Sequence, residues 1–250
     1  MNTAGDHLAL DKVARITGGL YLAYILASVL ATMLGQIGLG TASQVYQAMM
    51  TNEGSFRLGL VVALTTGFLF LATAWGLYVL LRRVNENLAL LFLLLNAVGV
   101  AIQGASMLSL VSAMLQGDGA SHMQAYSAAQ LEGLAYLSIN VYKTSFVTAQ
   151  LFFGAWLFPL GYLVYRSGYL PRFLGVLLVL DGFAVLTWFL KALLLPSYNA
   201  IHYPGLALSF AAELGLALWL LVKGVAVVGS RAGPAREERD ADLRAAWTAA

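Results

Sequence analysis

The sequence predicts an all-α integral membrane protein, a bundle of six transmembrane helices with both termini cytoplasmic and with helical external loops. Hydrophobic residues make up 60% of the 250 residues and charged residues only 10%, whereas soluble domains average about 45–50% apolar and about 25% charged residues. Six apolar runs are each long enough to cross about 30 Å of hydrocarbon as a helix. Lysine and arginine gather in alternate connections, as the positive-inside rule requires.

The six predicted spans are helices rather than barrel strands, because barrel strands would alternate in polarity over about ten residues. The first span follows Lys12 and Arg15. Its apolar run of about 20 residues is longer than a signal-peptide core, so we interpret it as a permanent helix. Residues 1–228 then form one transmembrane domain. The spans cover residues 14–36, 58–81, 88–115, 142–165, 172–195 and 205–228.

The charges fix the predicted orientation. With the N-terminus inside, eleven lysines and arginines fall on the cytoplasmic side and three, Arg57, Lys143 and Lys191, on the other. This bias places both termini in the cytoplasm, and we expect a bacterial cell membrane as the location. The tail, residues 229–250, mixes both signs of charge and contains few apolar residues. We expect it to be solvated and disordered.

The external connections are longer than the cytoplasmic ones. They cover residues 37–57, 116–141 and 196–204. The first contains a helical stretch at 41–50. In the second, residues 121–140 have the composition of an amphipathic helix that lies on the outer face or dips into it.

The composition also excludes several classes of site. The chain has no cysteine and three histidines, all outside the apolar runs, so we predict no metal site and no cofactor. A net charge of +2 without a basic stripe argues against nucleic acid as a partner. We therefore expect membrane lipids and a small amphipathic ligand as partners, with a homo-oligomer as a further option.

Several spans carry polar side chains at helical spacing. In a bilayer such residues must turn toward other helices and find partners there. Interhelical hydrogen bonding and a ligand site both explain the pattern, and the sequence leaves both open. The first span carries Thr17, Tyr21, Tyr24 and Ser28, the third Asn96 and Gln103, and the fourth Lys143 and Gln150. The candidate ligand-binding residues are Tyr24, Asn96, Gln103, Lys143, Gln150 and Lys191.

Two carboxyl groups, Asp181 in the fifth span and Glu213 in the sixth, lie at membrane depth. A charge there costs a few kcal/mol, so each group must be neutral, paired or facing a wet cavity. From the helical rise their depths differ by about 9 Å, which leaves direct contact open. Either they belong to a packing network, or they are binding or acid–base groups; we take them as the candidate catalytic pair.

Two stretches carry a resemblance to a known family. They are residues 160–175, LGYLVYRSGYLPRFLG, and residues 213–224, ELGLALWLLVKG. Together with Ala14-Arg15-Ile16 and Leu20-Tyr21-Leu22, they make the chain similar to the bacterial membrane family known as domain of unknown function 4386. The resemblance covers nearly the whole chain apart from the tail. It implies a multi-pass helical protein without an established activity, and it places Glu213 within the family pattern.

Three classes of function fit these residues. The first is binding or transport of a small apolar or amphipathic molecule through an outward-facing polar cavity near Glu213. The second is an intramembrane enzyme for a lipid or isoprenoid-like substrate, with Glu213 and Asp181 as acid and base. The third is a non-catalytic membrane scaffold or sensor. We expect the first, and the sequence leaves the question of enzymatic activity open.

Overall fold

The computed structural model describes residues 3–117, 125–195 and 202–225. The predicted tail, residues 229–250, lies outside the described residues. Within these ranges the chain forms helices without strands, and six helices are long and apolar enough to cross a membrane. The all-α multi-pass fold predicted from the sequence is therefore confirmed. The helices are α1 (Thr3–Gly35), α2 (Ala42–Thr51), α3 (Glu53–Leu81), α4 (Glu86–Gly117), α5 (Ala128–Arg166), α6 (Arg172–Leu194) and α7 (His202–Val222).

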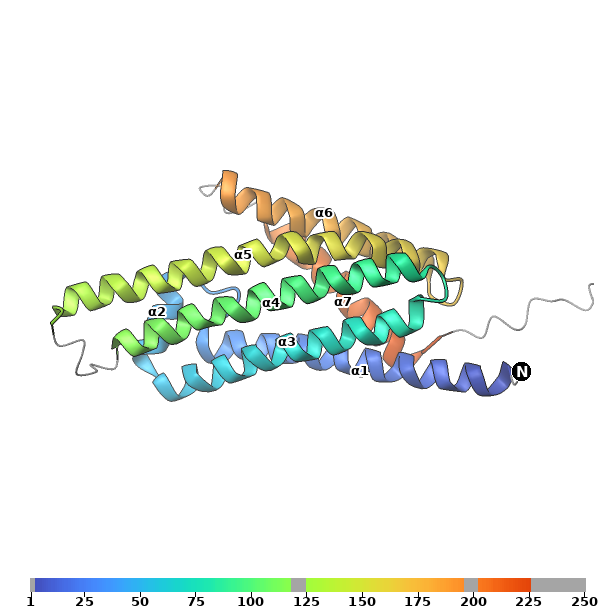
Figure 1. The fold of residues 1–250 in the computed structure, drawn as a ribbon, viewed down its shortest axis with the longest axis horizontal. Coiled ribbons are helices and arrows are strands. Elements are labelled where there is room, and N and C mark those ends of the chain that lie inside the picture. The colour runs from blue at the N-terminus through green and yellow to red at the C-terminus, as the bar shows by residue number, and fades with distance from the viewer. Residues whose placement is uncertain (1–2, 118–124, 196–201, 226–250) are drawn as a thin grey trace, which may run out of the picture.

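The six long helices form a closed ring. Each packs chiefly against two others, in the order α1, α3, α4, α5, α6, α7 and back to α1. Figure 1 shows them running along the long axis of the molecule, with α2 beside one end. We call this end the α2 end. We call the opposite end the basic end, because it carries the links around Arg82 and Arg166 and both ends of the described chain.

The connection that the sequence predicts as the second external one differs from its prediction in the described residues. Residues 128–141 do not form a separate helix on the outer face; they are the first turns of α5, which continues without a break to Arg166. A capping box starts the helix, since the Ser127 hydroxyl accepts from the Gln130 N–H and the Gln130 side chain accepts from the Ser127 N–H. The early part of α5 then packs beside α2, where Tyr46 and Tyr136 stack with their ring centroids 4.6 Å apart.

Several helix ends also differ from their predicted positions. The first helix begins at Thr3, well before residue 14, and α3 begins at Glu53 instead of 58. The last helix ends at Val222, although the apolar run predicted it to 228. Gly224 has a positive φ of 64°, and its N–H donates to the Trp219 and Leu220 carbonyls. This left-handed glycine ends the helix, which hydropathy alone does not reveal.

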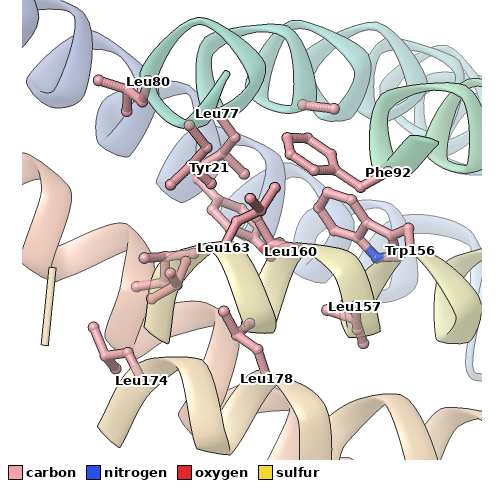
Figure 2. Packing of buried hydrophobic residues seen from close by; sticks show 14 of the residues in the cluster. Tyr21, Leu77, Leu80, Phe92, Trp156, Leu157, Leu160, Leu163, Leu174 and Leu178 are labelled. Atoms are coloured by element: carbon pink, nitrogen blue, oxygen red, sulfur yellow. The ribbon is translucent and has the colours of Figure 1, made fainter. Parts of the chain in front are cut away.

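Two clusters of buried side chains fill different parts of the bundle. The larger cluster draws on all six long helices toward the basic end, and Figure 2 shows Tyr21, Trp156, Leu160 and Leu178 within it. The smaller cluster lies at the α2 end and uses α1 to α5 with the loop after α1, but no described residue of α6 or α7. The ring is thus packed at the basic end, whereas no described residue of α6 or α7 joins the buried cluster at the α2 end.

Glycines set the close approach of α5 and α6 near the basic end. A Cβ at Gly161 would lie 2.7 Å from the Gly175 carbonyl oxygen, and one at Gly175 would lie 2.6 Å from the Gly161 oxygen. Backbone contact of this kind is how helices associate where lipid removes the hydrophobic driving force. It holds α6 in a fixed register along α5, and thereby fixes the depth of Asp181.

Candidate functional site

A cavity of about 730 Å³ lies between the two clusters of buried side chains, and residues of both clusters line it. All six long helices and the loop after α1 contribute to its wall, which is mainly apolar and aromatic. A volume of this size is typical of a small-molecule site, in which a few polar groups orient an otherwise apolar ligand. The polar side chains of the wall are Tyr24, Ser28, Thr32, Thr66, Gln103, Gln150, Ser209 and Glu213.

The structure brings four of the predicted site residues together. Tyr24 of α1, Gln103 of α4, Gln150 of α5 and Glu213 of α7 all line this cavity. The Gln150 side-chain amide donates to the Phe146 carbonyl of its own helix, 3.2 Å away. Its carbonyl oxygen therefore remains as an acceptor for a bound molecule.

Asp181 lies directly behind the cavity wall. Its side chain is fully buried on α6, and one carboxyl oxygen accepts a hydrogen bond from the Ser209 hydroxyl on α7. The other oxygen, Oδ2, has no hydrogen-bond partner within the described ranges. Because Glu213 follows Ser209 by one helical turn, the two carboxyl groups are close enough to interact electrostatically. The sequence left contact between them open, and the register of α7 against α6 provides this proximity.

The remaining predicted site residues lie outside the cavity wall. Lys191 is in the last turn of α6, nearer the α2 end than Asp181. Asn96 is fully buried on α4, and neither atom of its side-chain amide has a hydrogen-bond partner among the described residues. The structure therefore does not bring either side chain into the group around Glu213.

Lys143 holds the loop that forms one margin of the cavity. Its ammonium donates to the carbonyl oxygens of Gly38 at 3.0 Å and Gly40 at 2.5 Å. The hydroxyl of the preceding Tyr142 accepts from the Gly38 N–H at 2.7 Å. Ile37, Gly38 and Leu39 of the same loop line the cavity. The position of Lys143 thus gives it a contact with the loop rather than with the space inside.

Aromatic rings form the deep wall of the cavity. Phe70 stacks on Tyr24 with centroids 4.2 Å apart, meets Trp156 edge to face at 5.1 Å and lies 5.2 Å from Phe153. All four rings line the cavity. Sequence reasoning did not identify Phe70, Phe153, Trp156 or Ser209 as site residues. Ser209 and Glu213 share one face of α7 at i and i+4, and that spacing was a usable signal.

The cavity reaches the outer surface of the bundle between α1 and α7. Val29 and Met33 of α1 and Phe210 of α7 line it, yet their side chains are also exposed on the outside. Near the basic end the same two helices are in backbone contact, since a Cβ at Gly18 would lie 2.7 Å from the Ala217 carbonyl oxygen. The helices therefore diverge toward the α2 end, and the opening lies between two helices that are long and apolar enough to cross a membrane.

Comparisons with known proteins agree with the sequence resemblance. A model of the family described as "Domain of unknown function (DUF4386)" matches residues 16–224. An uncharacterized protein of Archaeoglobus fulgidus is 28% identical over 151 residues, which cover 60% of this chain and 74% of the relative. No solved structure matches the chain. The family resemblance predicted from the sequence is confirmed, and neither description names an activity.

Proposed function

We propose a function from the cavity itself, because the chain belongs to the family of domain of unknown function DUF4386, whose description names no activity. The protein binds a small, largely apolar molecule that it takes from the bilayer, as a binding protein or as one step of transport. The observation that carries this proposal is a single arrangement. One carboxyl group, Glu213, lines a cavity of about 730 Å³ that is otherwise mainly apolar and is open between two membrane helices.

The route into the cavity and the fit of a ligand inside it both support binding of an apolar molecule. An apolar molecule concentrates in the hydrocarbon, so an opening between α1 and α7 gives it direct access to the cavity. Inside, rings such as Phe70 and Trp156 contact its apolar part. The few polar groups can then orient its head group, since unpaired polar atoms at this depth are costly.

The test is photo-crosslinking in lipid nanodiscs with a neutral long-chain alcohol that carries a diazirine. We expect labelled peptides from the cavity walls of α1, α5 and α7. Ser28 lines the cavity, whereas Leu30 on the same helix is exposed and does not line it. Ser28→Trp fills part of the space and should reduce labelling of the α5 and α7 walls several-fold, while Leu30→Trp should leave it unchanged. Equal labelling of the two variants would exclude a ligand inside the cavity.

A second candidate is the intramembrane enzyme. The observation that favours it is the electrostatic interaction between Asp181 and Glu213, because two interacting carboxyl groups exchange protons readily and suit acid–base work. Recovery of the crosslinking probe, or of extracted native lipid, as a chemically changed product would support the enzyme. The scaffold or sensor remains a prediction from the charged tail, which lies outside the described residues.

A further inference from the structure

Within the described residues, no lysine or arginine is among the groups that interact with the Glu213 carboxyl. The groups that interact electrostatically with its carboxyl are Asp181 of α6 and Tyr21 and Tyr24 of α1. Acids and hydroxyls, rather than a lysine or an arginine, thus surround it in the described part of the chain. Two neighbouring carboxyl groups in a medium of low dielectric cannot both ionise without a compensating positive charge. The pair must take up that charge as a proton or as a bound cation.

A second observation points to a bound group. The Tyr21 hydroxyl is directed at the Glu213 carboxyl, but its geometry gives no regular hydrogen bond, and the side chain is fully buried. Asp181 Oδ2, also fully buried, is likewise without a partner in the part of the chain that the structure describes. An unmade hydrogen bond costs free energy in the interior. Both atoms lie behind the cavity wall, so they leave the negative charge of the Glu213 carboxyl unbalanced, and the positive charge of an ammonium group in the cavity would balance it.

The aromatic wall is the third observation. Tyr24, Phe70 and Trp156 line the same cavity as Glu213, and Phe70 contacts the other two rings. The faces of aromatic rings attract organic cations, and aromatic cages with a nearby acid are how proteins recognise alkylated ammonium groups. A hydrated metal ion has no comparable use for such a wall. The chemistry therefore favours an organic cation with an apolar body.

We propose that the molecule bound in the cavity is a lipophilic ammonium compound. Its cationic nitrogen pairs with the Glu213 carboxyl, the Asp181 carboxyl behind the wall adds to the attraction, and the apolar part extends toward the opening between α1 and α7. This inference rests on the proposed binding function and adds the charge of the ligand to it. The same chemistry belongs to a free hydrophobic amine and to the ammonium head group of a lipid.

The experiment compares two probes that differ only in charge. One is a phenylbutyl chain ending in trimethylammonium, and the other is its carbon isostere ending in a tert-butyl group. Binding is measured from the quenching of tryptophan fluorescence, since Trp156 and Trp188 line the cavity. The protein is held in phosphatidylglycerol nanodiscs, whose lipids carry no ammonium group. The wild type is compared with Glu213→Gln, and Glu132→Gln serves as the control because Glu132 is exposed outside the cavity.

We expect the cationic probe to bind the wild type and Glu132→Gln at least tenfold more tightly than Glu213→Gln. The neutral isostere should bind all three alike. Each probe is compared across variants in the same lipid, so its partition into the bilayer cancels. If the cationic probe shows no preference for the wild type while the neutral probe binds, the ammonium inference is overturned and the proposed binding function stands. If neither probe binds, both are overturned.

A measurement on the wild type alone covers the case in which Glu213→Gln does not fold. A bound cation replaces protons on the carboxyl pair, so binding of the cationic probe should weaken as the pH is lowered. The titratable groups that face Glu213 are Asp181 from α6 and Tyr21 and Tyr24 from α1. The neutral probe should show no such dependence, and parallel pH profiles for both probes would contradict the proposal. Repeating the titration in phosphatidylethanolamine nanodiscs identifies the source, because competition there indicates a lipid head group and its absence a free amine.

Discussion

Replacement of Lys143 by methionine should release the loop after α1. The change keeps an unbranched apolar chain but removes the ammonium that donates to the Gly38 and Gly40 carbonyl oxygens. Hydrogen bonds from a charged donor contribute about 1.5–3 kcal/mol each. Methionine avoids the cost of desolvating an ammonium and so recovers part of the loss. We expect the free energy of opening this loop to fall by about 2–3 kcal/mol.

Amide hydrogen exchange in nanodiscs measures this opening. Gly38 N–H donates to the Tyr142 hydroxyl, and Gly40 N–H donates to the Gln36 carbonyl, so exchange at both reports loss of the loop structure. A loss of about 2–3 kcal/mol corresponds to exchange that is about 30- to 150-fold faster. Tyr142→Phe removes one neutral hydrogen bond of about 1 kcal/mol and should accelerate exchange only about fivefold. Exchange in α3 should remain unchanged in both variants.

If Lys143→Met accelerated exchange no more than Tyr142→Phe does, the Lys143 ammonium would not stabilise the loop as the structure implies. That result would mean that the two short contacts at the loop carbonyls contribute nothing beyond what they cost in desolvation. Because Gly38 and Leu39 line the cavity, the same variant should also weaken binding of the neutral probe. Loop release without any effect on binding would separate the loop from the proposed function.

Two further predictions concern packing and pH. Gly161→Ala should destabilise the bundle by about 1–3 kcal/mol in chemical unfolding, because the new Cβ would lie 2.7 Å from the Gly175 carbonyl oxygen. A Cβ at Gly104 would have no other atom within 4 Å, so Gly104→Ala should be neutral or stabilising by up to about 1 kcal/mol. Similar effects of the two substitutions would contradict the close approach of α5 and α6. Tyr169, in the link between these helices, donates to the Leu80 carbonyl at 2.6 Å, and burial raises the pKa of Tyr169 to about 12. Its stabilising contribution should therefore be complete below pH 10.0, the ordinary pKa, and should disappear as the pH rises toward 12. In Tyr169→Phe, the free energy of unfolding should no longer fall with pH over this range. The same pH dependence in the variant and the wild type would rule the effect out.

The two carboxyl groups of the site could be predicted from the sequence, but the distance between them could not. Asp181 and Glu213 stand out in the sequence because charge is rare at membrane depth. Their separation could not be obtained from counting residues along each helix. The distance between the two carboxyl groups depends on the register of α7 along α6. The hydrogen bond from Ser209 to Asp181 shows that register. The aromatic wall was not predicted for a related reason. Every span contains aromatic residues, and only the packing of the helices decides which of them contact one another.

The sequence by itself determined that the protein lies in a membrane and how many spans it has. A bilayer requires each crossing segment to satisfy its own backbone and to be apolar over about 20 residues, and both requirements can be read locally. Tertiary structure alone decided that residues 128–141 extend α5, that Lys143 holds a loop, and that Asp181 lies directly behind the wall of the cavity that Glu213 lines. These outcomes depend on contacts between residues far apart in the chain. Lipid contributes no hydrophobic preference among helix faces, so close packing and polar pairing had to choose which faces turn inward.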